Sequence, residues 1–235
     1  VNSIETTKRG AILIGSNIGL YGYNPLSNSI KQAEFTTLGG RKIIKNPIQT
    51  IFTKKDGSIW LGTVSDGLIE ILNTPTNYYE FKYHTITNKR ILTLDSNDEG
   101  SLFCGTENDG LFILNKEGEI NSLKYERSKT KGIKSNSIWS TFIDDKNRIW
   151  LGYFNQGIDI YDKEKERFKS IESIPNKDQS LYSKSVTAIA QDSQKRFWFG
   201  IADGGVDVYD PLTEKFTHLI DQSNPIAKAL QVVTW

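Results

Sequence analysis

A short segment recurs five times along this chain of 235 residues, and this repetition constrains the fold more than any other feature. The clearest copies are Arg148-Ile-Trp-Leu-Gly152 and Arg196-Phe-Trp-Phe-Gly200, and Ser58-Ile-Trp-Leu-Gly62 matches them. Weaker copies run from Ala11 to Gly15 and from Ser101 to Gly105. The closing glycines are 47, 43, 47 and 48 residues apart. A period of this length indicates one structural unit that packs against copies of itself.

Each copy contains four short stretches that have the pattern of β-strands. In the fourth copy we predict strands at 137–144, 148–152, 157–162 and 167–171, separated by turn residues and by a loop at 153–156. Strands this short, with apolar residues at every second position, indicate an antiparallel meander. In the second copy the third strand is one residue longer, which predicts a bulge.

Such units predict an all-β fold, a β-propeller of four-stranded antiparallel blades. A single four-stranded sheet leaves both of its faces bare, and radial stacking covers them. We therefore predict one propeller domain or propeller fragment over residues 1–235. The repeats are assigned to 1–44, 45–88, 89–134, 135–183 and 184–223, with the first strand of a sixth at 224–235. A closed five-bladed ring and an arc of a larger ring both fit this count; the absence of methionine and the abrupt end favour the arc.

One position of the repeat, two residues before the closing glycine, is filled by large apolar side chains. It is occupied by Leu13, Trp60, Phe103, Trp150 and Trp198. A side chain that recurs at one repeat position serves the repeat, so we interpret these residues as the packing layer between blades.

The composition argues against several classes of function. Lys and Arg number 29 and Asp and Glu 28, so the basic excess typical of nucleic-acid binding is missing. No apolar run approaches the roughly 18 residues that a membrane helix needs. One cysteine, Cys104, and two histidines leave little for a zinc site. We predict no cofactor, no metal site, no nucleic-acid partner and no membrane contact by this region.

No catalytic residues are predicted either. P-loop, serine-hydrolase and zinc-protease motifs are absent from the sequence. Asp159 and Asp207 occupy the same position in their repeats, so they read as repeat residues rather than as a pair for glycoside hydrolysis. His84 and His218 form no ligand pattern.

The fifth repeat, Ser185 to Gly200 followed by Gly204 to Pro211, resembles the two-component regulator propeller repeat. The similarity covers nearly the whole chain and is strongest in repeats two, four and five; Phe103-Cys104 and Leu13-Ile14 depart from it. The resemblance implies the periplasmic sensor region of a Bacteroides-type hybrid two-component receptor, where paired seven-bladed propellers precede a membrane span and a histidine kinase. It also implies a small-molecule ligand, an oligosaccharide in many such receptors, and a homodimer formed through the full-length receptor.

A ligand site is expected on one face of the propeller, formed by the loops that join the second and third strands and by the segments that join successive repeats, which are long at Glu172 to Lys184. These loops vary between repeats, and binding residues concentrate on loops held by a rigid scaffold. The fourth repeat departs most from the others. Aromatic rings beside amide groups suit the apolar face and the hydroxyl groups of a sugar. The predicted ligand-binding residues are Tyr153, Phe154, Asn155, Gln156, Trp139, Asn108, Asp109 and Asp203.

Packing offers another explanation for the aromatic members of this set. Tyr153 or Phe154 packs on a neighbouring loop in that interpretation, and Trp139 fills a gap. The long segment from Tyr125 to Asn136 carries Arg127, Lys129, Lys131 and Lys134. It is either a solvated basic loop or a contact for an acidic sugar or a partner chain.

Three functions fit the sequence. The favoured one is a non-catalytic extracytoplasmic sensor that recognises an oligosaccharide. The alternatives are a propeller scaffold for dimerisation or protein docking, and a polysaccharide lyase or hydrolase.

Overall fold

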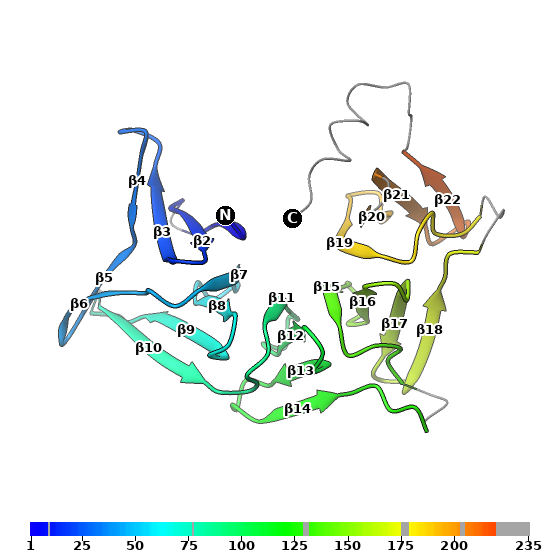
Figure 1. The fold of residues 1–235 in the computed structure, drawn as a ribbon, viewed down its shortest axis with the longest axis horizontal. Helices are drawn as coiled ribbons and strands as arrows, with labels where there is room; N and C mark the ends of the chain where they lie inside the picture. The colour runs from blue at the N-terminus through cyan, green and yellow to red at the C-terminus, as the bar shows by residue number, and fades with distance from the viewer. Residues whose placement is uncertain (9, 77, 129–131, 175–178, 203–204, 220–235) are drawn as a thin grey trace. The chain divides into compact units, whose positions relative to one another are not determined.

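Every regular element in the computed structural model is a β-strand over the described residues, which are 1–8, 10–76, 78–128, 132–174, 179–202 and 205–219 (Figure 1). They form two compact units, residues 1–96 and 97–235, and each unit is described by itself. A single domain over 1–235 stays a prediction. The expected first strand of a sixth repeat, 224–235, lies outside the described residues.

The first unit contains two complete antiparallel sheets. The sheet of repeat one has the order β1-β2-β3-β4, and the sheet of repeat two has the order β10-β9-β8-β7. A two-stranded hairpin, β5-β6, lies between them in the sequence, and β11 ends the unit. The strands are β1 (Ser3–Thr6), β2 (Ile12–Ser16), β3 (Gly19–Asn24), β4 (Ser29–Gln32), β5 (Glu34–Thr37), β6 (Gly40–Ile43), β7 (Ile48–Thr53), β8 (Ile59–Thr63), β9 (Leu68–Asn73), β10 (Tyr79–His84) and β11 (Ile91–Ser96).

The second unit continues the pattern. Its complete sheets have the orders β15-β16-β17-β18 and β19-β20-β21-β22, each a meander of sequential strands (Figure 1). The strands are β12 (Leu102–Thr106), β13 (Leu111–Leu114), β14 (Ile120–Leu123), β15 (Ile138–Ile143), β16 (Ile149–Tyr153), β17 (Ile158–Asp162), β18 (Arg167–Ile171), β19 (Val186–Gln191), β20 (Phe197–Ile201), β21 (Gly205–Asp210) and β22 (Lys215–His218). The four strands expected in repeat four are present, and each end lies within one residue of its prediction.

The repeated segment forms the second strand of each sheet, and it is the most buried strand. Every residue of β8, β12 and β16 is buried. A strand covered on both faces needs a continuous apolar run, which explains why Ile-Trp-Leu-Gly recurs without polar alternation. The closing glycine has a steric cause. A Cβ at Gly152 would lie 3.0 Å from Cγ1 of Val186, the first residue of β19.

The packing layer inferred from the sequence is clearest around Trp150. Its ring stacks on Phe197 of the next repeat, with the ring centroids 3.7 Å apart, in a cluster that includes Phe199 and Val186. The indole Nε1 donates a hydrogen bond of 2.9 Å to Asp144, which also accepts from Arg148 Nε at 2.7 Å. Trp198, Arg196 and Asp192 repeat this arrangement one repeat later.

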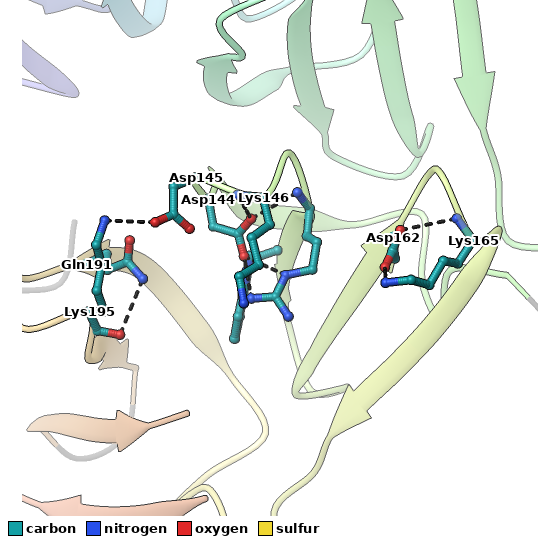
Figure 2. Close-up of polar contacts among 9 residues, drawn as sticks. Asp144, Asp145, Lys146, Asp162, Lys165, Gln191 and Lys195 are labelled. Carbon is teal, nitrogen blue, oxygen red and sulfur yellow. Dashed lines mark hydrogen bonds and ion pairs between the residues drawn. The ribbon is translucent and has the colours of Figure 1, made fainter. Parts of the chain in front are cut away.

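In repeats four and five, charged side chains on the turns between strands form ion pairs with one another. Figure 2 shows Asp145 with Lys195 and Asp162 with Lys165, both joined by ion pairs of 2.9 Å. Asp144 lies beside them and accepts a hydrogen bond from Trp150 of β16, the strand that follows the turn. These contacts hold the turns in place.

The predicted bulge in the third strand of repeat two is wrong. β9 pairs with β8 and with β10 without a shift of register, because the extra residue simply lengthens the β9-β10 hairpin. Register shifts occur instead between the first and second strands of repeats two, four and five. The bulge in repeat four lies at the candidate site.

Candidate functional site

Trp139 occupies the bulge of β15. Ile138 pairs with Tyr153 and Ser140 pairs with Gly152, so one residue of β15 has no partner on β16. The corresponding residues in repeats two and five are Gln49 and Thr187. Bulges often redirect a side chain next to a functional site. Repeat four therefore places a large aromatic ring at a position where the other two bulged repeats have polar side chains.

The ring of Trp139 stacks on that of Phe154. Their centroids are 4.8 Å apart and their planes meet at 25°. Phe154 exposes 52% of its surface, and Trp139 is half-buried. The two predicted aromatic residues thus come together as a pair that is open to solvent. Each also packs on the other, so the packing interpretation describes part of their role.

Tyr153 has a different position from Phe154. It ends β16, it is fully buried, and its hydroxyl donates a hydrogen bond of 2.9 Å to Asp159. The expected loop therefore begins at Phe154, one residue later than predicted. Burial raises the pKa of Tyr153 well above its ordinary value, and the nearby Asp159 carboxylate adds to this effect. Tyr153 has no exposed surface for a ligand and supports the loop from beneath.

Asp159 links this interior to the preceding repeat. Its buried carboxylate accepts hydrogen bonds from Tyr153, from Ser170 Oγ at 2.6 Å and from the backbone N–H of Lys134 at 3.1 Å. Burial raises the pKa of Asp159, although these donors oppose the shift. Asp207 holds the backbone N–H of Tyr182 in the same way, at 2.8 Å. The two repeat aspartates therefore fix the long segments after β14 and β18.

Two asparagines are connected to the segments that carry the aromatic pair. Asn155 is exposed, has a φ of +61° and donates its backbone N–H to Ser185 Oγ at 3.3 Å. Asn108 in the β12-β13 loop is also exposed, and its Oδ1 accepts from Ser137 Oγ at 2.7 Å. Since Ser137 comes directly before β15, Asn108 is joined to the segment that carries Trp139.

Gln156 lies at a small polar cavity of about 90 Å³. The other lining residues are Lys134, Glu172, Ser173 and Lys184. Lys134 Nζ forms an ion pair with Glu172 and lowers the pKa of that carboxyl group. Two lysines against one glutamate give the cavity a positive balance. It therefore suits a small anionic or strongly polar group.

The remaining predicted residues are less informative. Asp109 forms an ion pair of 2.5 Å with Lys124, within its own repeat. Asp203 lies outside the described residues, as do Lys129 and Lys131 of the basic segment. Sequence reasoning did not include Glu172, Ser173 and Lys184 among the site residues. The length of the segment after β18 was the only signal that pointed to them.

The groups available for chemistry are few in the part of the chain that the structure describes. No three His, Cys, Asp or Glu side chains gather there as a metal site requires. Cys104 is fully buried, and burial raises the pKa of its thiol, which opposes a nucleophilic role. His84 pairs with Glu70 at 3.1 Å and His218 with Asp207 at 2.7 Å. The described residues include no helix long and apolar enough to cross a membrane.

The stacked four-stranded antiparallel meanders define the fold of a β-propeller. Solved structures share this fold. They include the extracellular domain of the putative hybrid two-component system BT4673 from B. thetaiotaomicron, 18% identical, with a TM-score of 0.53 over 94% of this chain and 36% of that one. The extracellular domain of the putative hybrid two-component system BT3049 from the same organism is 15% identical, with a TM-score of 0.64 over 95% and 35%. This chain thus spans about a third of those receptor domains.

An enzyme shares the fold as well. Virginiamycin B lyase from Staphylococcus aureus is 12% identical, with a TM-score of 0.66 over 96% of this chain and 71% of the lyase. No protein-family model and no curated protein matches the sequence. At these identities the likeness concerns the fold, and propellers host unrelated activities. Function therefore has to be argued from the site.

Proposed function

We propose that this chain is a non-catalytic, ligand-binding part of an extracytoplasmic sensor and that it binds an oligosaccharide on the surface of Trp139 and Phe154. The observation that carries the proposal is the stacked aromatic pair, because it breaks the repeat at a bulge and leaves Phe154 half exposed. A residue that only supported the scaffold would be covered, as Tyr153 is. A flat aromatic surface offers apolar contact to the C–H face of a sugar ring.

The polar groups around this pair complement a sugar's hydroxyl groups. The side chains of Asn155 and Gln156 follow Phe154 directly, and both are exposed. Each amide offers two donors and an acceptor. The loop that carries them is held by the hydrogen bond from Asn155 to Ser185 and by the support of Tyr153 beneath it. A loop fixed in advance loses less conformational entropy when a ligand binds.

The charge around Gln156 favours a glycan with an acidic group. Lys134 and Lys184 line the polar cavity, and Glu172 balances one of them. A carboxylate or sulfate on the ligand would meet the remaining positive charge. The ligand class we propose is thus an oligosaccharide that carries an acidic substituent.

The sensor role is supported by the fold that this chain shares with extracellular domains of hybrid two-component systems. On this proposal the chain acts in the periplasm, and the full-length receptor forms a homodimer. The lyase of the same fold provides the competing hypothesis, in which a bound polysaccharide is cleaved. Product formation from a polysaccharide panel would favour that hypothesis over a sensor.

Calorimetric titration of the full chain with neutral and acidic oligosaccharides tests the proposal. We expect binding to an acidic member, and we expect Phe154→Ala and Trp139→Ala each to weaken it by about two- to tenfold, since an aromatic contact contributes roughly 0.5–1.5 kcal/mol. Tyr83→Ala is the matched control, because Tyr83 is 54% exposed on β10. Binding that is unchanged in both variants, or no binding to any glycan, would refute the site.

A further inference from the structure

The first unit contains a cavity of about 670 Å³ between its two complete sheets. Repeat one, repeat two and the β5-β6 hairpin all contribute residues to it. The lining is Thr7, Lys8, Ala11, Leu13, Ala33, Glu34, Phe35, Asp56, Gly57, Ser58, Ile59, Leu72, Asn73 and Tyr79. Cavities of 300–1,000 Å³ with an apolar lining and a few polar groups are typical of small-molecule sites. This one shares no residue with the site around Trp139.

The cavity lies where another pair of repeats has two aromatic rings. In repeats four and five the corresponding space holds Trp150 stacked on Phe197. The same two repeat positions in repeats one and two are Leu13 and Ile59. Both side chains are smaller, and both line the cavity. Repeat one therefore loses the aromatic ring that fills this layer elsewhere.

The rest of the wall is specific to repeat one. The β5-β6 hairpin replaces the simple connection after the fourth strand, and its Phe35 packs edge-to-face on Tyr79 of β10, with centroids 5.1 Å apart. Lys42 of the hairpin lies 4.4 Å from the ring centroid of Phe81, the next inward residue of β10. The hairpin is thus fixed against repeat two. It closes one side of the cavity with aromatic surface.

Polar groups accompany this apolar wall. Asp56 accepts hydrogen bonds from the backbone N–H and Oγ of Ser58, at 2.8 and 2.6 Å, so its carboxylate is held in one orientation. The side chains of Lys8 and Asn73 also line the cavity, and Lys8 is exposed. Glu34 of the hairpin adds a second carboxylate to the lining. A ligand here therefore meets apolar side chains on one part of its surface and polar or charged side chains on the other.

We propose that this cavity binds a small molecule with an aromatic ring that carries a polar N–H or O–H group. The ring occupies the layer between Leu13 and Ile59 that Trp150 and Phe197 fill in the second unit. The polar group is held by Asp56 or Asn73. The proposal goes beyond oligosaccharide sensing, because it assigns a second site with a different class of ligand to a different unit.

Indole is the probe for this cavity, because it is the ring that Leu13 lacks relative to Trp150. Binding to the full chain is measured by ligand-observed NMR, and Leu13→Trp restores the side chain that the repeat has elsewhere. We expect indole to bind the unchanged chain and Trp139→Ala, and to bind Leu13→Trp at least tenfold more weakly. Leu26→Trp is the matched control, since Leu26 is 97% exposed.

The result that overturns the proposal is an absence of indole binding to the unchanged chain, or equal binding to a folded Leu13→Trp. Ile59→Phe fills the same layer from the other side with the side chain of Phe197, and it replaces Leu13→Trp if that variant fails to fold. Loss of indole binding in Trp139→Ala alone would assign the probe to the aromatic pair and would also refute the cavity. Glycan titration is independent of all these outcomes.

Discussion

Repeats one and two and repeats four and five solve the same packing problem with different side chains. In the second unit Trp150 stacks on Phe197 and ties its indole N–H to the fully buried carboxylate of Asp144. In the first unit Leu13 and Ile59 take the two ring positions and line a cavity of about 670 Å³. The fold tolerates this loss because each meander keeps its ladder and closing glycine. The repeat therefore keeps its fold when smaller side chains replace the aromatic rings between two successive sheets.

The connections between repeats differ in the same way. In the second unit, buried Asp159 and Asp207 hold the backbone of the segments after β14 and β18. In the first unit, the hairpin β5-β6 follows β4 and packs on β10 through Phe35. One arrangement positions polar loops around an aromatic pair, and the other closes a cavity. The two candidate sites therefore arise from two different departures from one repeat.

The largest expected effect on stability comes from truncating Trp150, whose ring fills the layer between the sheets of repeats four and five. Trp150→Ala should lower the free energy of unfolding by about 3–5 kcal/mol, the usual loss for a large buried aromatic residue. Leu13→Ala should lower it by about 2 kcal/mol, at the lower end of its class, since Leu13 already borders empty space. Urea unfolding of both variants measures the difference. Equal losses would show that the layer in the first unit is as tightly packed as the one in the second.

The next largest effect concerns the hydrogen bond between the indole N–H of Trp150 and Asp144. Asp144→Ala removes the acceptor of Trp150 Nε1 and of Arg148 Nε. Leaving a buried donor without its partner costs about 1–3 kcal/mol. Thr7 occupies the same repeat position in the first unit, where its Oγ1 accepts from the exposed backbone N–H of Ala11. Thr7→Ala should lower stability by less than Asp144→Ala does, because the donor that it leaves without a partner is exposed to water. A similar loss in the two variants would contradict this contrast.

Much of this architecture is predictable from the sequence, because the repeat imposes it. The strands of repeat four, the glycine after Trp150 and the layer around that tryptophan follow from a pattern that recurs. The cavity does not follow from the pattern along one repeat. Leu13 is visible as a departure, but its effect depends on Ile59, which belongs to the next repeat. Only the packing of successive sheets brings the two positions together.

The candidate site was partly predictable for the same reason. Trp139 and Phe154 stand out because they break the repeat, and the structure brings them together. Tyr153 breaks the repeat too, yet it extends β16 into the interior and bonds to Asp159. An aromatic residue at the end of a strand can continue the strand or begin the loop, and the sequence does not distinguish these. The register of β15 against β16 decides it, through the pairing of Ile138 with Tyr153.

A smaller effect tests whether Tyr153 only supports the loop while Trp139 and Phe154 form the binding surface. Tyr153→Phe keeps the ring and removes the hydrogen bond to Asp159, which should cost about 1 kcal/mol. Because Tyr153 has no exposed surface, glycan affinity should stay within about twofold of the unchanged chain. Calorimetry and urea unfolding of one sample measure both quantities. A tenfold loss of affinity with full stability would make the hydroxyl group part of the binding surface.

The smallest effect is a pH dependence that belongs to repeat five. Hydrogen bonds from Trp198 Nε1 and from Arg196 lower the pKa of Asp192 to about 2, from an ordinary value of 3.8. A lowered carboxyl pKa stabilises the folded state above pH 3.8, and this stabilisation is lost as the pH falls towards 2. Asp192→Asn removes the titrating group, so the stability difference from the unchanged chain should be constant above about pH 5 and shrink below pH 4. Thr7→Ala, which alters the same position in repeat one, should show no such change because no carboxyl group is there.

Urea midpoints measured from pH 2 to 7 test both expectations. A stability difference for Asp192→Asn that stays constant down to pH 2 would mean that the hydrogen bond between Asp192 and Trp198 is too exposed to couple to folding.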